Sequence, residues 1–229
     1  MFQTVIRRCS PRLLVLVAGI LTQTSSGARA DDQAQAWYQS QIFYRLSPHW
    51  SVGNYAEARL NDGVGELHTW MISPRVRYDL TSHLQLQFNT SWVEAFNAPQ
   101  TRKVDSFRLE VEVNPRLELT RDLQFSMRNR FEWRWMEGGE DYNTRARIRP
   151  QLDWTISRTG LFRGLYANNE VIYDFDLDRV TENRLVPLGV VLRPSEALEV
   201  RVFHMWRRTL GGNTWFDYHA VGVMASLNF

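Results

Sequence analysis

The sequence predicts an all-β protein, an antiparallel up-and-down transmembrane β-barrel of about 10–12 strands. Three observations predict this fold. Apolar and polar residues alternate with period two through most of the chain, the polar positions are rich in arginine, and aromatic residues gather at both ends of the apolar stretches. No apolar run reaches the roughly 18 residues of a bilayer-spanning helix, and the single cysteine excludes a disulfide scaffold.

Residues 1–30 have the three parts of a cleavable secretory signal peptide. Basic residues precede a short apolar stretch at 13–21, and Ala28-Arg29-Ala30 supplies a small-x-small cleavage site. We therefore expect residues 31–229 to form the mature barrel, in the outer membrane of a Gram-negative bacterium. The removed segment carries four of the 27 basic residues and none of the 25 acidic ones, which leaves 23 against 25. This balance gives no support to nucleic-acid binding.

Eleven stretches alternate strictly and are separated by turn-forming residues, which is the pattern of successive β-hairpins. In the stretch 107–119, for example, phenylalanine, leucine and valine fall on one face, while arginine, glutamate and asparagine fall on the other. Short turns are expected at one end of the barrel and longer loops at the other. The expected strands are 36–46, 50–60, 69–80, 84–96, 107–119, 123–135, 145–156, 163–176, 184–193, 198–208 and 217–229.

The number of stretches departs from the even strand number of bacterial single-chain barrels. Two solutions are open. Either residues 31–46 lie partly in the lumen beside a ten-stranded wall, or two short strands are counted as one and the total is twelve. Prolines recur at 74, 115, 150 and 187, on strands that follow the longer loops; because proline removes a ladder donor, we interpret them as β-bulges.

Charged residues dominate the face that would line the lumen. The turn at 120–122 predicts Glu112 opposite Arg130 and Arg108 opposite Arg134 across one hairpin. On the whole inward face, fourteen arginines meet ten acidic residues, an excess of four positive charges. The expected lumen charge cluster is Arg75, Arg77, Arg108, Glu110, Glu112, Arg128, Arg130, Glu132, Arg134, Arg145, Arg147, Arg149 and Asp153. The other inward charges are Arg45, Arg59, Arg116, Arg201, Arg207, Glu57, Asp79, Glu118, Glu170, Asp174 and Glu199.

Tryptophan and tyrosine on the apolar face fall near strand ends, as two aromatic girdles. Indole and phenol rings favour the headgroup level of a bilayer, whereas a soluble β-sandwich would concentrate them in the middle of strands. One girdle, beside the short turns, is Tyr44, Trp50, Tyr78 and Trp154; the other, beside the longer loops, is Trp70, Trp92, Trp133, Trp135 and Trp206.

The chain ends on an alternating stretch with a terminal aromatic residue. It resembles the last strand of bacterial outer-membrane barrels, the element that their assembly machinery reads. The residues expected to carry this assembly signal share one face: Val221, Val223, Ala225, Leu227 and Phe229.

The mature chain also resembles the domain of unknown function 2490 family of barrel proteins. The resemblance covers nearly all of the mature chain and implies an outer-membrane barrel, but it implies no activity, because the family has no assigned chemistry. The segments that carry it are 129–134, 145–150 with Leu152, 166–175, 182–185 and 226–229.

Four function classes follow from these observations. Long arginine side chains fill much of a narrow lumen, which favours a structural barrel plugged by salt bridges. The excess of arginine favours instead a narrow anion-preferring diffusion pore for small acidic solutes or oligosaccharides, because rings of arginine select anions. A lipid-modifying enzyme and a partner-binding barrel are the remaining classes, and short loops disfavour the last.

The sequence predicts no catalytic, cofactor-binding or metal-binding residue. The five histidines are scattered, and only His204 and His219 could approach one another, with Ser226 too far along the strand and no third metal ligand at suitable spacing. The expected partners are outer-membrane lipid, the barrel-assembly machinery and periplasmic chaperones during biogenesis, and a small anionic solute if the lumen conducts; no nucleic acid is expected.

Overall fold

The computed structural model describes residues 34–61, 66–96, 103–139 and 141–229. The signal peptide predicted at 1–30 and the mature N-terminus predicted at residue 31 lie outside the described residues. None of the described residues belongs to a helix of the length and apolarity that crossing a membrane requires.

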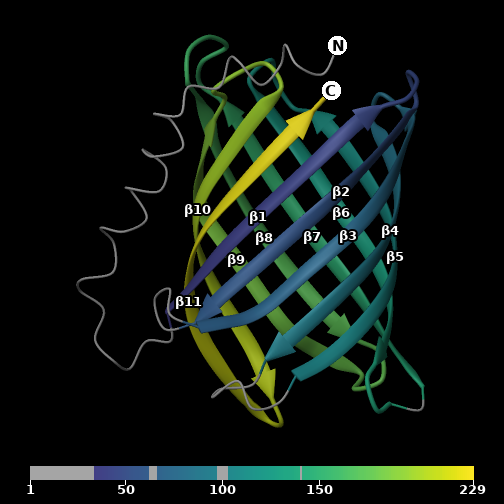
Figure 1. Cartoon of the computed structure of the whole chain (residues 1–229). Helices are drawn as coiled ribbons and strands as arrows, with labels where there is room; N and C mark the ends of the chain where they lie inside the picture. The colour runs from purple at the N-terminus through teal and green to yellow at the C-terminus, as the bar shows by residue number, and fades with distance from the viewer. Residues whose placement is uncertain (1–33, 62–65, 97–102, 140) are drawn as a thin grey trace. The chain divides into compact units, whose positions relative to one another are not determined.

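The described residues form a closed β-barrel of eleven tilted strands (Figure 1). Strands that follow one another in the chain pair antiparallel, and β1 closes the barrel by pairing parallel with β11. The predicted fold class is therefore confirmed. The strands are β1 (Ala34–Arg45), β2 (Trp50–Asn61), β3 (Glu66–Thr81), β4 (Leu84–Phe96), β5 (Lys103–Glu118), β6 (Leu123–Met136), β7 (Tyr142–Thr155), β8 (Phe162–Asp174), β9 (Arg179–Leu192), β10 (Leu198–Gly211) and β11 (Thr214–Asn228).

The strand number is eleven, so the ten-stranded and the twelve-stranded solutions are both wrong. β1 is part of the wall and pairs with a strand on each side, from Ala34 opposite His219 to Phe43 opposite Asn228 on the β11 side. The seam is completed at its end, where the Phe229 carbonyl accepts from Arg45 N at 2.9 Å and Phe229 N donates to the Phe43 carbonyl at 3.0 Å. An even number is required only when every neighbouring pair is antiparallel, and one parallel pair lifts that requirement.

The turns next to Phe229 define what we call the C-terminal rim: 46–49, 82–83, 119–122, 156–161 and 193–197. Among the described residues, the opposite rim carries 137–139, 141, 175–178 and 212–213, and it is also where β2 and β4 end and where β3 and β5 begin. The expected division into short turns and longer loops is wrong for the last two hairpins. Strand pairing continues there through residues expected to be loop, so that β9 begins at Arg179 and only 212–213 separate β10 from β11.

The interpretation of the prolines as bulges is right at one position and wrong at three. Around Pro187 the register of β9 shifts against both of its neighbours. At Pro74, Pro115 and Pro150 the pairing keeps one register on both sides of the strand. A proline in these strands removes one donor on one side only, and the other ladder holds the strand in place.

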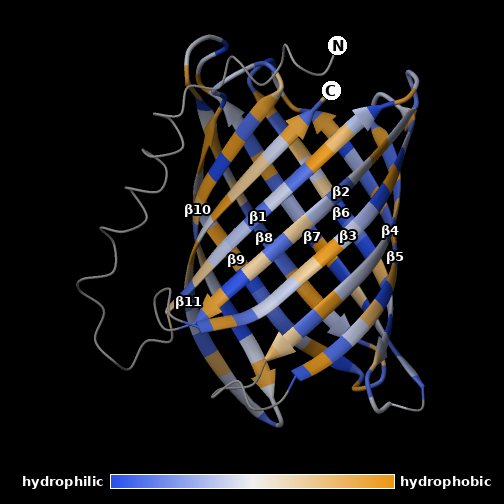
Figure 2. Cartoon of the chain, viewed as in Figure 1, coloured by the Kyte–Doolittle hydropathy of each residue, from blue (hydrophilic) through white to orange (hydrophobic). Residues whose placement is uncertain are grey.

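The wall has an apolar outer face and a polar inner face, and the two alternate along the strands (Figure 2). On β4, Phe88 exposes 46% of its surface, whereas its neighbours Gln87 and Asn89 expose 4% and 0%. Apolar side chains outside and polar side chains inside invert the arrangement of a water-soluble β-sheet domain.

The structure places the nine aromatic residues predicted as girdles on the outer face. Near the opposite rim, the rings of Trp92, Phe107, Trp135 and Tyr142 form a row across four strands, with successive centroids 5.1, 5.9 and 5.7 Å apart. Near the C-terminal rim, the rings of Trp50 and Tyr78 lie 4.7 Å apart. These contacts make continuous aromatic surface at both ends of the outer face.

Two charged residues on the otherwise apolar outer face, Glu94 and Arg208, form ion pairs at the opposite rim. Glu94 accepts a hydrogen bond from the Trp70 indole and pairs with Lys103. Arg208 pairs with Asp217 at 2.8 Å on the neighbouring strand. The middle of the outer face is therefore mostly apolar, and His204 on β10 is a polar residue there.

Three inward aromatic rings lie over glycines directly opposite them on the next strand. The pairs are Phe43 with Gly53, Tyr166 with Gly189 and Phe203 with Gly222. A Cβ atom at these glycines would lie 2.6, 2.2 and 2.1 Å from the respective ring. Only glycine leaves the space for a large ring to lie flat against the wall of so narrow a lumen.

We predict that Gly189→Ala destabilises the barrel by about 1–3 kcal/mol, because the new methyl group displaces the Tyr166 ring. The measurement is the urea midpoint of unfolding in detergent micelles. In a Tyr166→Ala background the same substitution should cost much less, since the ring is gone. An equal cost in both backgrounds would contradict the steric explanation.

Candidate functional site

The residues of the predicted lumen charge cluster lie on the inner faces of β3, β5, β6 and β7. The register across the β5–β6 hairpin is the predicted one, with Glu112 opposite Arg130 and Arg108 opposite Arg134. The sequence alone predicts this arrangement, because alternation fixes which residues face the lumen and the turn length sets the register of the hairpin.

Arg130, in the middle of β6, contacts three carboxylates. Its Nη1 lies 2.8 Å from Glu110 and 3.4 Å from Glu132, and its Nη2 lies 2.5 Å from Glu112. The three glutamates expose 0, 1 and 2% of their surface and Arg130 exposes 5%. Charges this deeply buried are stable only when they are paired and hydrogen-bonded, and Arg130 meets that condition for all three acids.

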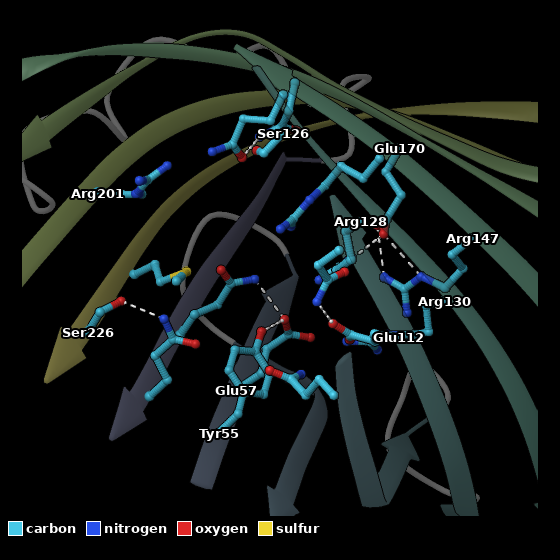
Figure 3. A pocket seen from close by; sticks show the side chains of 18 of the residues that line it. Tyr55, Glu57, Glu112, Ser126, Arg128, Arg130, Arg147, Glu170, Arg201 and Ser226 are labelled. Carbon is cyan, nitrogen blue, oxygen red and sulfur yellow. Dashed lines mark hydrogen bonds and ion pairs between the residues drawn. The ribbon is translucent and has the colours of Figure 1, made fainter. Parts of the chain in front are cut away.

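The ion pairs continue from β6 to β8 through Arg147. Arg147 Nη1 donates to Glu132 at 2.8 Å, and its Nη2 donates to Glu170 at 2.8 Å. Arg128 also pairs with Glu170. Figure 3 shows Arg128 and Arg147 both directed at this one carboxylate.

Further ion pairs carry the network across β9 and β10 to β1. Arg184 lies 3.3 Å from Glu170 and 2.7 Å from Glu182, and Arg207 donates to Glu182 at 2.6 Å. Arg207 also donates to Gln35 at 3.4 Å. The network thus passes the parallel seam, where Arg207 also faces the ring of Tyr218 on β11 at 5.4 Å.

Neutral side chains extend the network in the other direction. Asn89 donates to Glu110 at 3.0 Å, and Ser91 Oγ lies 3.1 Å from Glu110 and 2.8 Å from Ser73 Oγ. Ser73, Asn89 and Ser91 are each 0% exposed, which leaves no water-accessible gap beside β3 and β4 at this level.

We call this network the buried belt. It runs around the inner face of the wall from β3 to β10. It reaches β1 and β2 through Gln35, which donates to Asn61 at 3.0 Å. Between β2 and β3 the contact is a cation–π pair, with the Arg75 guanidinium 4.0 Å from the centre of the Tyr55 ring. The members of the belt are Ser73, Asn89, Ser91, Glu110, Glu112, Arg128, Arg130, Glu132, Arg147, Glu170, Arg184, Glu182, Arg207, Gln35 and Asn61.

Like charges lie directly opposite one another at several positions in the belt. Arg130 is opposite Arg147, and Glu110 is opposite Glu132. Their repulsion is offset by diagonal contacts, because each arginine reaches acids one step along the neighbouring strand. The charges therefore alternate in space although they do not alternate across each rung.

A cavity of 410 Å³ extends from the belt toward the C-terminal rim (Figure 3). Its polar lining near that rim includes Gln85, Asn114, Ser126 and Asn228. Ten arginines and four glutamates line it, so its walls are strongly basic. These are Arg59, Arg75, Arg77, Arg108, Arg128, Arg130, Arg147, Arg149, Arg184, Arg201, Glu57, Glu112, Glu170 and Glu199.

Sequence reasoning missed two groups of lumen residues. The first is Arg184 with Glu182, because the strand that holds them was expected to begin at 184 and begins at Arg179. The second group is aromatic: Trp37, Tyr55, Tyr166 and Phe203 face the lumen and are 2 to 8% exposed. The sequence did contain a signal for such residues. Trp37 lies two residues from each of the inward glutamines Gln35 and Gln39, and therefore on the same face of the strand.

His204 and His219 meet on the outer face, with 3.2 Å between His204 Nε2 and His219 Nδ1. Ser226 points into the lumen instead, where its hydroxyl accepts from Gln41 at 2.9 Å. The histidine pair and this serine therefore lie on opposite faces of the wall. Among the described residues, no three His, Cys, Asp or Glu side chains are grouped as metal ligands.

Comparison with known proteins gives one matching family and four matching chains among the solved structures. The model of a family described as "Protein of unknown function (DUF2490)" matches residues 34–216. No curated protein matches the chain. A solved structure described as "NanC porin structure in rhombohedral crystal form" aligns with 12% sequence identity and a TM-score of 0.47, over 84% of this chain and 97% of that one.

Arg147 and Arg149 offer a matched test of the belt, because both point inward from β7 and only Arg147 has acidic partners. We predict that Arg147→Gln costs on the order of 3–5 kcal/mol, since it removes a partner from buried Glu132 and Glu170. Arg149→Gln should be close to neutral, because Arg149 lies opposite Arg128 and its removal relieves repulsion. The urea midpoint measures both, and equal losses would contradict a belt held by ion pairs.

Proposed function

Since the chain belongs to the DUF2490 family of proteins of unknown function, its role has to come from its geometry, and we propose an outer-membrane β-barrel whose lumen is closed by the buried belt. In this proposal the barrel is a structural element of the membrane, and it is not an open diffusion pore. The observation that carries it is the belt itself, with Glu110, Glu112, Glu132 and Arg130 at most 5% exposed in the middle of the lumen.

Three features support a membrane location. The outer face is apolar, its aromatic residues gather near both rims, and its few charges are paired at one rim. The closed ladder of strands satisfies the backbone groups of the wall, as a spanning barrel requires. The signal peptide expected at 1–30 and the C-terminal strand with Phe229 fit export and insertion, and they orient the C-terminal rim toward the periplasm.

A closed lumen follows from the combination of belt and bulky side chains. Inward tryptophan, tyrosine and methionine on β1, β2, β3 and β10 fill the sector where the belt is formed by few charges, at Trp37, Tyr55, Met71 and Met205. A solute the size of a hydrated ion has to separate these side chains or break ion pairs. Both carry a free-energy cost that an open porin does not have.

An anion-preferring pore is the second candidate, and one observation favours it. The cavity is lined by ten arginines and four glutamates, and its polar lining continues to the C-terminal rim. If rearrangement of the belt opened the lumen, the basic walls would favour anions.

Electrical recordings separate the two candidates. We predict that the purified barrel gives no stable conductance in planar bilayers, because the belt blocks the water path. Replacing Arg130 and Arg147 together by alanine should create a leak in those molecules that fold, since both residues hold buried acids on the neighbouring strands and their removal opens the belt. A stable anion-selective conductance of the unaltered protein would support the pore and contradict the closed barrel.

Location is tested independently of conductance. The mature chain should fractionate with outer membranes and run faster on gels before boiling than after it, because a hydrogen-bonded barrel resists detergent at room temperature. Recovery as a soluble periplasmic monomer would contradict the membrane proposal.

The assembly machinery and outer-membrane lipid are the partners that this proposal requires. The backbone of Phe229 closes the seam with β1, so deletion of the residue would confound folding with recognition. Phe229→Ala keeps those backbone bonds. We predict that this variant refolds normally in detergent but reaches the membrane in much lower yield in cells, and equal yields would remove the terminal ring from the proposed signal.

A further inference from the structure

The arginines that line the cavity divide into two sets by their partners. Six of them pair with at least one carboxylate: Arg59, Arg128, Arg130, Arg147, Arg184 and Arg201. The other four are Arg75, Arg77, Arg108 and Arg149. Among the described residues, none of these four has a carboxylate oxygen within 4.0 Å of its guanidinium group. The unmatched positive charge of the lumen is thus collected in one cavity.

Three of the four have a buried donor with no acceptor. The Nε–H groups of Arg75, Arg108 and Arg149 are buried and make no hydrogen bond within the described part of the chain. A buried donor without an acceptor costs free energy, and a buried charge without a counter-charge costs more. An oxyanion in the cavity would offset both costs at once, because guanidinium groups bind carboxylates by charge-assisted hydrogen bonds.

Neutral side chains in the same cavity indicate which further groups a bound anion would carry. Gln39 and Gln41 project from β1, and each uses only its Nε2, which donates to Glu57 and to Ser226. Their amide oxygens make no hydrogen bond with the described residues and can accept from hydroxyl groups. Two of the aromatic rings in the cavity are covered by arginines, Trp37 by Arg59 at 3.9 Å and Tyr55 by Arg75 at 4.0 Å.

We propose that the cavity is a binding site for a small carboxylate that bears several hydroxyl groups. The unmatched guanidinium groups of Arg75, Arg77 and Arg149 hold the carboxylate, and the amides of Gln39 and Gln41 hold hydroxyl groups; Arg108 lies further toward the opposite rim. A volume of 410 Å³ accommodates an open-chain sugar acid with room for water. The ligand enters from the C-terminal rim, where the polar lining is partly exposed at Gln85 and Asn114. Binding in this cavity leaves the belt intact, so the site does not depend on whether the lumen conducts.

The experiment is isothermal titration of the purified mature barrel in nonionic detergent with gluconate as the probe. Sorbitol, which has the hydroxyl groups without the carboxylate, and propionate, which has the carboxylate without the hydroxyl groups, are the matched comparisons. We expect gluconate to bind at least about tenfold more tightly than either, because each lacks one half of the recognised chemistry. No binding of gluconate, or equal binding of gluconate and propionate, would overturn the proposal.

Variants locate the site. Arg75→Gln and Arg149→Gln should each weaken gluconate binding about tenfold or more, because each removes a charged donor. Arg45→Gln is the matched control: its side chain is 62% exposed at the C-terminal rim and does not line the cavity, so affinity should be unchanged. An equal loss in all three variants would place binding elsewhere and overturn the assignment.

The same series of variants includes a control for loss of folding. Arg149→Lys keeps the charge and should retain binding better than Arg149→Gln at an equal melting temperature. If Arg149→Gln fails to fold, the comparison of Arg149→Lys with the unaltered protein, together with Gln39→Ala, still decides the matter. Gln39→Ala should weaken gluconate relative to propionate, whereas Arg149→Lys should weaken both, because both carry the carboxylate. An unchanged ratio in Gln39→Ala, or an unchanged affinity for both ligands in Arg149→Lys, would contradict the site.

Discussion

Inside a narrow closed barrel an arginine side chain cannot reach bulk water, so its charge must be matched by a carboxylate within hydrogen-bonding distance. In the belt of this protein the requirement is met cooperatively. Arg130 contacts three carboxylates, and Glu170 in turn receives Arg128, Arg147 and Arg184. Because each charge is shared, the removal of one partner affects several others, and the inner face behaves as one unit instead of a set of separate pairs.

This shared pairing explains how the inner wall tolerates like charges on adjacent strands. The tilt and stagger of barrel strands bring each inward side chain close to residues diagonally placed on the next strand. Large aromatic rings fit on the same inner face because glycines lie opposite Tyr166 and Phe203 on the neighbouring strands. The inner face thus combines a charged sector on β5 to β9 with a more apolar sector around β10, β11 and β1.

The unmatched positive charge of the lumen is concentrated in one cavity. Acids and arginines balance within the belt, while the arginines without a carboxylate partner line the cavity. Six members of the belt also line this cavity, so the proposed closure and the basic cavity share the same walls. The parallel seam between β1 and β11 places Gln39 and Gln41 opposite this basic wall, so the odd strand number also contributes to the composition of the cavity.

The sequence by itself determined the barrel, the face of each residue and the register of at least one hairpin, because period two fixes the face and turn length fixes the register. It also determined an excess of four inward arginines, and four of the predicted inward arginines have no acidic partner in the described structure. Only the tertiary structure decided which four these are, because ion pairs form diagonally and across several strands. The same holds for the parallel closure of β1 on β11 and for Glu182 and Arg184 in the belt, since pairing between chain ends and the true start of a strand depend on partners that are distant in sequence.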